Sequence, residues 1–589
     1  MPRKRFKSLL SRMSSLLNLR FIILFCMIVL NFLFMHYYIA THIGLEDYPN
    51  CRAVSNLWAC VVDAVVIYLF SYLLTIGRVR VSLPLAFFLS MVLAYANILY
   101  ARFFGIYLPK NVLFQIGNLN DKDVLLSILS AVSYVDALFL VFAAIFGFLY
   151  VKWKDKGLQK KSFASLLTSV GIVYMYFILW LLFHIGDGKY YQSFKDGFYD
   201  LVPYYKWESS VKPNIYLFKM GFTRRFLYCM SDYISNNYEL TQNQIDEIAS
   251  FCSDHSERIS DRPLLKDKNL IFILVESYLS ETADLVVDGH EITPFMNRLK
   301  TERNVYFNSH IHPNITCGQS SDGQLIYMTG LLPLRSVITV DVAKSCQLKG
   351  LPKLLKEYGR IKSSHIVIPT VATFWSQDDM CKVYGIDKIY SKDDVQDRAA
   401  VSADLTDEQI FSMASSVDCQ TAPPFFSLIL TMSMHGPYHL KPDSDFTLTD
   451  SSLPEKYRNY LIKCHYFDEQ IEQYINSLKE TGVYDRSVIV IASDHHIEPK
   501  QLDMEGRIST DLPLFIINGD INMRQSWTGT CNQLDVYTTL LDLFVRDDWC
   551  GLGHTLLRPK YRDSYTPQAD RLSEWILRGD YFNQQLTAK

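Results

Sequence analysis

The stretch N-L-I-F-I-L-V-E-S at 269–277 decides how the C-terminal two-thirds of the chain folds. Its unbroken apolar run ends in the carboxylate Glu276, which is typical of a strand buried on both faces. Three similar short runs follow: S-S-H-I-V-I-P at 363–369, F-F-S-L-I-L-T-M-S at 425–433 and S-V-I-V-I-A-S-D-H-H at 487–496. Helix-like stretches such as Tyr457–Lys479 lie between these runs. Strands that alternate with helices predict an α/β layered domain with a largely parallel sheet.

A second stretch, N-I-T-C-G-Q-S-S-D-G-Q-L-I-Y-M-T-G-L-L at 314–332, joins a turn of small residues to a helix. The turn runs from Thr316 to Ser321, and the apolar helical run starts at Leu325. Ser320 therefore lies at or near a helix N-terminus, where free N–H groups and the helix dipole favour an anion. A serine there either caps the helix, which is its more common role, or acts as a nucleophile.

Polar side chains follow three of the expected strands. Glu276 ends the first, His435 follows the 425–433 run, and Asp494 and His495 end the last. Taken singly, such residues usually cap helices or satisfy local hydrogen bonds. As a set they lie where a parallel sheet binds its ligands, and mixed oxygen and nitrogen donors suit Zn²⁺ or Mn²⁺. A metal touching Ser320 would lower the pKa of its hydroxyl and make it a usable nucleophile.

The first third of the chain is membrane-like. It contains five apolar stretches, each near the ~20 residues that span a bilayer: about Phe21–Ala40, Leu57–Ile76, Leu83–Phe103, Leu125–Val151 and Ala164–Ile185. Asp63 and Asp136 each interrupt one of these stretches. Basic residues cluster at the N-terminus and after the second and fourth stretches. If the spans alternate, these clusters share one side, which predicts a cytoplasmic N-terminus and an external C-terminal part. Cleavage of a signal peptide after about Ala40 is the alternative, which the length of the run and the four later stretches disfavour.

At 589 residues the chain is too long for one compact domain. We expect a five-helix transmembrane domain at 1–186 and an amphipathic juxtamembrane connector at 187–263. An external α/β catalytic domain at 264–560 and a C-terminal tail at 561–589 follow. The formal net charge of −3 gives no general case for nucleic acid binding. None of the twelve cysteines forms a C-x-x-C pair, so free buried thiols are expected, although an external location would allow disulfides.

Six motifs in the C-terminal part occur in the order found in one known family: I-L-V-E-S-Y at 273–278, G-Q-S-S-D at 318–322, F-W-S-Q-D-D-M at 374–380, Y-G-I-D-K at 384–388, T-M-S-M-H-G-P at 431–437 and S-D-H-H at 493–496. With the apolar stretches before them, they make the chain resemble the alkaline phosphatase/sulfatase superfamily. Within it, the chain is similar to the membrane-anchored lipoteichoic acid synthase and phosphoethanolamine transferase group. The resemblance implies a sulfatase-like catalytic domain held at the outer face of a membrane.

The resemblance also implies roles for individual residues. Glu276, Asp494 and His495 match the family's metal ligands, for one divalent ion, Mn²⁺ or Zn²⁺, with Mg²⁺ as a further candidate. Ser320 stands where the family keeps a nucleophilic Thr that also touches the metal. His435 matches a residue that contacts the transferred head group and protonates the leaving group.

Two further positions concern the head group. Trp375 matches an aromatic residue that lines the head-group pocket. Gln377 stands where lipoteichoic acid synthases have an Arg that grips glycerol phosphate, and Gln supplies neither that charge nor a bidentate clamp. The departure leaves phosphoglycerol, phosphoethanolamine or another phospho-head group open.

The expected function is therefore transfer of a phospholipid head group to a glycan or lipid acceptor, in a bacterial inner membrane, through a covalent phospho-Ser320 intermediate. A phosphodiesterase or phosphatase on the same fold is the main alternative, with Thr316 or Ser321 as the next candidates for the nucleophile. A non-catalytic membrane scaffold is a further alternative. A sulfatase is disfavoured, because neither Ser320 nor Cys317 begins the C/S-x-P-x-R motif that formylglycine formation needs.

Overall fold

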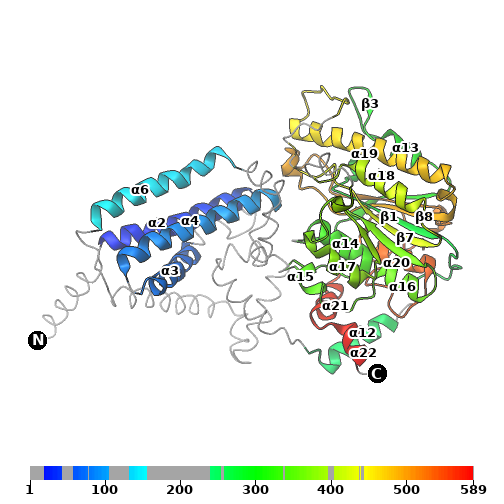
Figure 1. Cartoon of the computed structure of the whole chain (residues 1–589), viewed down its shortest axis with the longest axis horizontal. Helices are drawn as coiled ribbons and strands as arrows, with labels where there is room; N and C mark the ends of the chain where they lie inside the picture. The colour runs from blue at the N-terminus through cyan, green and yellow to red at the C-terminus, as the bar shows by residue number, and fades with distance from the viewer. Residues whose placement is uncertain are drawn as a thin grey trace, which may run out of the picture. The chain divides into compact units, whose positions relative to one another are not determined.

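The computed structural model describes residues 19–42, 57–76, 78–104, 132–154, 239–253, 258–316, 318–335, 338–395, 404–436, 438 and 444–587. The chain divides into two compact units, an N-terminal and a C-terminal one. Each unit is described by itself (Figure 1).

The N-terminal unit is built of apolar helices: α2 (Leu19–His42), α3 (Leu57–Leu74), α4 (Val79–Phe104) and α6 (Ala137–Trp153). Among the described residues, three helical stretches are long and apolar enough to cross a membrane, Arg20–Thr41, Val79–Arg102 and Tyr134–Trp153, and Ala59–Leu74 is a shorter apolar helix. These helices coincide with the first three predicted stretches and most of the fourth. The fifth stretch, 164–185, lies outside the described residues, so the count of five stays a prediction.

The two aspartates that interrupt apolar stretches both lie inside this unit. Asp63 is buried on α3. Asp136, just before α6, forms an ion pair with Arg102 of α4 at 2.6 Å, and both side chains are less than one-tenth exposed. A charge in an apolar helix bundle is tolerated when it is paired in this way, and the pair also links α4 to the start of α6.

The C-terminal unit is organised on an eight-stranded sheet of strand order β10-β4-β9-β8-β1-β7-β5-β6. The strands are β1 (Asn269–Val275), β4 (Val305–His312), β5 (Ser363–Val367), β6 (Lys388–Tyr390), β7 (Phe425–Leu430), β8 (Ser487–Ser493), β9 (Leu512–Ile517) and β10 (Cys531–Asn532). A small hairpin is formed by β2 (Val286–Val287) and β3 (His290–Glu291). All four predicted strands are present, and β1, β8 and β9 are buried along their whole length.

The sheet is mixed, because β9 runs antiparallel to both of its neighbours, β4 and β8. The other strand pairs are parallel. Residues 494–511, which link β8 to β9, contain one short 3-10 turn and no crossover helix. The chain therefore re-enters the sheet from the edge at which it left, and the new strand runs in the opposite direction.

Helices cover both faces of the sheet: α18 and α19 lie on one face, and α14, α16 and α20 on the other (Figure 1). The helices of this unit are α12 (Gln242–Ser253), α13 (Pro294–Leu299), α14 (Ser320–Thr329), α15 (Val340–Ala343), α16 (Leu351–Glu357), α17 (Gln377–Tyr384), α18 (Asp407–Asp418), α19 (Glu455–Glu480), α20 (Leu534–Phe544), α21 (Pro567–Arg578) and α22 (Tyr581–Thr587). The predicted helix 457–479 is α19. The nine cysteines in the described ranges are free thiols.

Helix α14 begins at Ser320, five residues before the apolar run that predicted it. Its polar first turn is as deeply buried as its apolar remainder, since residues 321–329 are all buried. An apolar periodicity cannot mark a helix start whose polar residues also face the interior. Helix α14 is thus an interior helix from Ser321 onward, whereas Ser320 at its N-terminus is half-buried.

Candidate metal centre and active site

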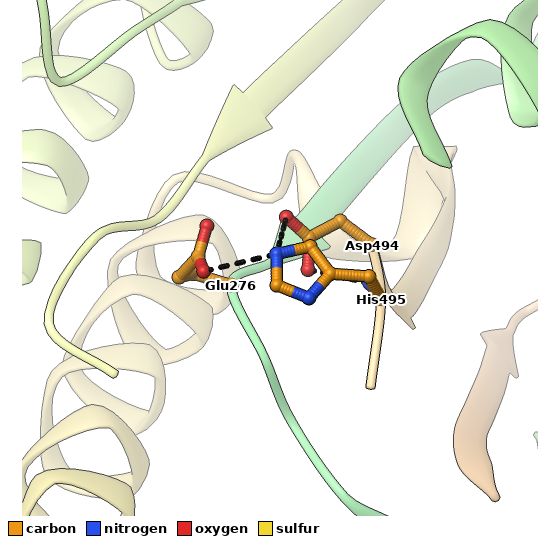
Figure 2. Close-up of side chains that lie close together, drawn as sticks. All are labelled: Glu276, Asp494 and His495. Atoms are coloured by element: carbon orange, nitrogen blue, oxygen red, sulfur yellow. Dashed lines mark hydrogen bonds and ion pairs between the residues drawn. The ribbon is translucent and has the colours of Figure 1, made fainter. Parts of the chain in front are cut away.

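The sheet register brings Glu276 and Asp494 together. Strands β1 and β8 are neighbours and parallel, with Val275 opposite Ser493. The next residue of each strand is a carboxylate, and the Asp494 N–H still donates to the Val275 carbonyl at 3.0 Å. Two acids that are far apart in sequence therefore leave the sheet side by side (Figure 2).

His495 completes a compact cluster with these two acids. Ligand-type atoms of Glu276, Asp494 and His495 all lie within 4.8 Å of one another, and all three residues are buried. The Nε2 atom of His495 lies 3.3 Å from Glu276 Oε1 and 3.6 Å from Asp494 Oδ2 (Figure 2). Its Nδ1 lies 2.8 Å from the His496 carbonyl, which can only accept, so Nδ1 carries the hydrogen and Nε2 faces the carboxylates.

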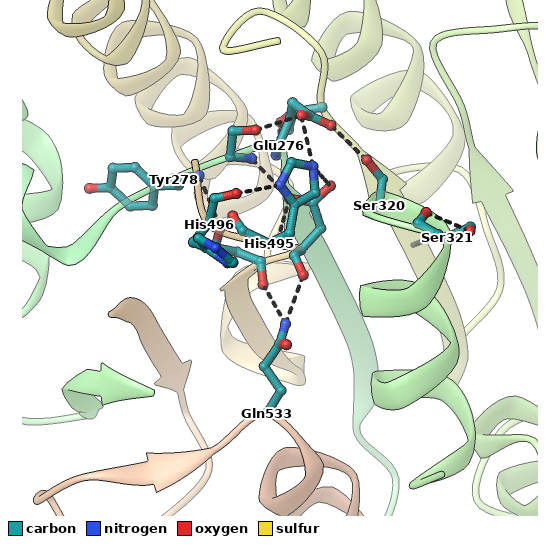
Figure 3. A network of polar contacts seen from close by, with 12 residues as sticks. Glu276, Tyr278, Ser320, Ser321, His495, His496 and Gln533 are labelled. Atoms are coloured by element: carbon teal, nitrogen blue, oxygen red, sulfur yellow. Dashed lines mark hydrogen bonds and ion pairs between the residues drawn. The ribbon is translucent and has the colours of Figure 1, made fainter. Parts of the chain in front are cut away.

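Neighbouring groups hold the two carboxylates in place. Ser277 donates its hydroxyl to Glu276 Oε1 at 2.7 Å and its N–H to Asp494 Oδ1 at 2.8 Å. Gln533 donates to the Asp494 carbonyl at 2.7 Å (Figure 3). Neither supporting residue was predicted from the sequence. Ser277 adjoins a predicted ligand and could have been suspected, but Gln533 lies far along the chain and no pattern marks it.

The electrostatics of the cluster favour a cation beside the carboxylates. Burial, together with the charge of Glu276, raises the pKa of Asp494 to about 7. Burial lowers the pKa of His495, but the charges of Asp494 and Glu276 outweigh it and raise that pKa to about 10. Burial acts to raise the pKa of Glu276, yet His495 and His435 bring it well below its usual range.

The donor set fits one divalent metal ion. Two carboxylates and a neutral imidazole carry a charge of about −2, which matches a dication, and two oxygens with one nitrogen suit Zn²⁺ or Mn²⁺. The Nε2 of His495 points at both carboxylates, as a ligating nitrogen would once a metal displaced its proton. Three protein ligands with a further position for a hydroxyl or substrate oxygen form the arrangement of a catalytic site.

Ser320 lies against this cluster. Its Oγ donates to Glu276 Oε2 at 3.1 Å (Figure 3). The residue preceding α14 is Gln319, whose φ is +47°, and its side chain makes no capping bond. The Ser320 hydroxyl is therefore directed to a candidate metal ligand from the N-terminus of a buried helix, where the helix dipole favours a negative charge.

The two alternative nucleophiles use their hydroxyls elsewhere. Thr316 donates to Asp322 Oδ2 at 2.8 Å and to the Leu334 carbonyl at 3.0 Å. Ser321 donates to the Gly318 carbonyl at 2.7 Å. These three bonds stabilise the turn before α14, and the buried Asp322 carboxylate also accepts the N–H groups of Thr316 and Gly318, each at 2.9 Å. The turn is thus shaped by Asp322, for which sequence reasoning assigned no role.

His435 follows β7 and is exposed. Its Nδ1 lies 2.7 Å from the Gly436 carbonyl, so Nδ1 carries the hydrogen and Nε2 remains for substrate. The ring lies close enough to Glu276 for its charge to lower the pKa of that carboxyl. The structure therefore brings together Glu276, Asp494, His495 and Ser320 in direct contact, with His435 nearby at the solvent side.

Trp375 and Gln377 differ from each other in their surroundings. Trp375 and Ser376 both have positive φ, 52° and 51°, a strained conformation for residues other than glycine and one that is common at ligand sites. The Gln377 side chain is buried, and its amide forms two reciprocal hydrogen bonds with the amide of Gln324 on α14, at 3.0 and 2.6 Å. Gln377 is thus held one helical turn from Ser320, and its amide is already paired.

Comparison with known proteins agrees with this fold. Residues 268–545, slightly less than half of the chain, match the sulfatase family model. In sequence the chain resembles lipoteichoic acid synthase, as its motifs predicted, and in fold it resembles a phosphoethanolamine transferase.

The relatives include lipoteichoic acid synthase of Staphylococcus aureus, 28% identical over 431 residues. That match covers 69% of this chain and 62% of the relative, so the chain spans about three-fifths of the relative's length. Among solved structures, lipooligosaccharide phosphoethanolamine transferase A of Neisseria meningitidis covers 93% of this chain and 98% of its own, at 13% identity and a TM-score of 0.51, which indicates a shared fold. The lipoteichoic acid synthase LtaP of Listeria monocytogenes, at 19% identity, covers 55% of this chain and 81% of its own with a TM-score of 0.45.

Proposed function

We propose that the protein is a membrane-anchored, metal-dependent transferase that moves the phospho-head group of a phospholipid to a glycan or lipid acceptor. The observation that carries the proposal is the contact between the Ser320 hydroxyl and Glu276, at 3.1 Å, beside Asp494 and His495. The similarity to lipoteichoic acid synthase supports the reaction class. The apolar N-terminal helices support a location in a membrane, which we take to be the bacterial inner membrane. The basic clusters on one side of the apolar stretches support a catalytic domain outside the cytoplasm.

Glu276, Asp494, His495 and the Ser320 oxygen would hold the metal. When bound, a divalent ion supplies Lewis-acid stabilisation of charge on the phosphoryl oxygens and lowers the pKa of the Ser320 hydroxyl. The remaining chemistry falls to side chains of this chain. Trp375 lies on the strained segment beside α17 and is our candidate for one wall of the head-group pocket.

In the first half-reaction Ser320 has lost its proton to solvent, and its Oγ forms a bond to the phosphorus of the donor. The bond from phosphorus to the diacylglycerol oxygen breaks as His435 Nε2 donates a proton to that oxygen. In the second half-reaction the same nitrogen takes the proton of the acceptor hydroxyl, whose oxygen attacks phosphorus. The bond from phosphorus to Ser320 then breaks, and Ser320 regains a proton. General acid–base catalysis of this kind contributes roughly 10²–10⁴-fold.

The test is the intact mass of the full chain in detergent after incubation with phosphatidylglycerol or phosphatidylethanolamine and Mn²⁺ or Zn²⁺. A mass gain of one phosphoglycerol or phosphoethanolamine, mapped to the Ser320 peptide, is the expected result, and its size identifies the head group. Ser320→Ala should give no adduct, whereas Ser321→Ala, whose hydroxyl bonds only within the turn, should still form it.

Two outcomes would contradict the proposal. Release of free head group with no acceptor product would identify a hydrolase with water as the final acceptor. Full transfer activity in the Ser320→Ala variant would show that the nucleophile lies elsewhere.

A further inference from the structure

The loop that carries His435 is anchored along its length. Thr431 accepts the Glu276 N–H at 3.0 Å, which ties the end of β7 to a candidate metal ligand. The buried Asp407 carboxylate at the start of α18 accepts the N–H groups of Met432 and Ser433 at 2.7 and 2.9 Å. These bonds fix the loop from Thr431 to Ser433.

The anchor at His435 itself comes from α19. Lys463 donates from Nζ to the His435 carbonyl at 2.6 Å. The next residue, Cys464, contacts the Met434 sulfur at 3.4 Å. The ammonium also lies 5.4 Å from the centre of the Tyr438 ring, so the loop is held by Lys463 on both sides of Gly436.

The position of Lys463 is costly for a residue with a merely structural role. Burial lowers the pKa of its ammonium to about 8, although the charges of Cys464 and Glu276 act in the opposite direction. Lys463 is half-buried and its ammonium bonds a neutral carbonyl, so its charge is less well compensated than that of a cation in an ion pair. A neutral donor or an apolar contact would hold a loop at lower cost, so the charge itself suggests a functional role.

We propose that Lys463 is a positioning residue for His435. The ammonium–carbonyl bond holds the backbone of His435 so that Nδ1 stays on the Gly436 carbonyl and Nε2 faces the leaving oxygen. This inference rests on the proposed function, in which His435 Nε2 gives its proton to the diacylglycerol oxygen as the phosphorus–oxygen bond breaks. Charge-assisted hydrogen bonds are about twice as strong as neutral ones, which suits an anchor for a single exposed side chain.

The experiment compares two leaving groups in the full chain in detergent. One donor is the phospholipid whose adduct on Ser320 the mass experiment identifies, and its leaving alkoxide needs a proton. The other is the p-nitrophenyl ester of the same phospho-head group, whose phenolate leaves without one. For Lys463→Met we expect adduct formation from the phospholipid to fall by about 10–100-fold, part of the full contribution of a general acid, with the p-nitrophenyl ester changed by no more than about threefold.

Three variants serve as comparisons. His435→Ala should show the same dependence on leaving group, and more strongly. Lys463→Arg keeps a charged donor and should recover most of the phospholipid rate. Lys479→Met is the matched control, because Lys479 lies on the same helix and 5.0 Å from the centre of the Tyr484 ring, as Lys463 does over Tyr438, but outside the site.

Equal losses with both donors in Lys463→Met would overturn the inference, since they indicate general damage or direct binding of the phosphate by Lys463. Unchanged rates with both donors would overturn it too. If His435→Ala showed no dependence on leaving group, the acid role of His435 and the inference would both fail. The proposed transferase would still be supported by the Ser320 adduct of the unmodified chain, so the two failures are distinguishable.

Discussion

Gly323 lies directly against the main chain of Asp494. A β-carbon at position 323 would lie 2.2 Å from the Asp494 carbonyl oxygen and 2.8 Å from its carbon. Because Gly323 belongs to the first turn of α14, this close approach allows the helix that begins with Ser320 to reach the turn that carries two candidate metal ligands.

Gly323→Ala should therefore displace Ser320 from the cluster. The obstructing atoms are backbone, so the helix must move, and overpacking of this kind costs about 1–3 kcal/mol of stability. A displacement near 1 Å can lower a catalytic rate about 10²-fold, and we expect at least that loss in formation of the Ser320 adduct. Gly147→Ala is the control, because a β-carbon there meets nothing within 4 Å. An alanine variant at 323 with full activity would contradict the proposed role of this contact.

Ser277→Ala tests the support of the metal ligands. The change removes the 2.7 Å bond from the Ser277 hydroxyl to Glu276 Oε1 and leaves the backbone bond to Asp494 intact. Loss of a hydrogen bond to a ligating side chain lowers metal affinity about 10–100-fold, and calorimetric titration with Mn²⁺ and with Zn²⁺ should show such a decrease. Glu276→Gln should weaken binding further. Glu281→Gln, which changes a carboxylate bonded to Tyr457, should bind metal normally; weak binding in that variant would point to a general loss of structure.

Local patterns allowed much of this fold to be predicted. The strands β1, β5, β7 and β8 and the long helix α19 each have a continuous or periodic apolar signal, and the residues at the strand ends were placed correctly beside one another by the logic of a parallel sheet. The reversed direction of β9 could not be predicted in the same way, because its buried apolar sequence looks the same in either direction. The direction of β9 follows from the absence of a crossover helix between β8 and β9.

The supporting residues of the site were harder to predict for a different reason. Gln533, Gln324 and Lys463 are ordinary polar residues on or beside helices, and their roles arise from contacts across the fold. Gln324 bonds a residue 53 positions away, and Gln533 one 39 positions away. Such contacts have no local signature in a single sequence.

The paired amides of Gln324 and Gln377 should be energetically coupled. Each side chain satisfies the other in a buried position, so replacing one leaves the other unpaired at a cost of about 1–3 kcal/mol. Removing both should cost less than the sum of the single changes. Chemical denaturation of Gln324→Ala, Gln377→Ala and the double variant would measure this coupling, and additive losses would show that the two amides act independently.

Asp468 should make the stability of the C-terminal domain depend on pH. This buried carboxylate on α19 accepts the N–H groups of Phe295 and Met296 at the start of α13, at 2.7 and 2.9 Å. Burial raises its pKa in the folded state from 3.8 to about 7. The folded protein thus binds this proton more tightly than the unfolded chain, so the stabilising contribution is complete below about pH 4 and is lost as the pH rises to about 7.

Asp468→Asn removes the titrating group and should flatten this dependence. Between about pH 4 and pH 7 the unmodified protein should lose up to roughly 1.4 kcal/mol of unfolding free energy per pH unit from this one carboxyl, and the variant should lack that slope. Denaturant midpoints of the full chain in detergent across this range measure the difference. Asp503→Asn is the control for loss of a negative charge, since Asp503 is exposed and pairs with Lys456 in the first turn of α19, away from Asp468. Parallel pH profiles for Asp468→Asn and the unmodified protein would show that the folded state does not hold this proton.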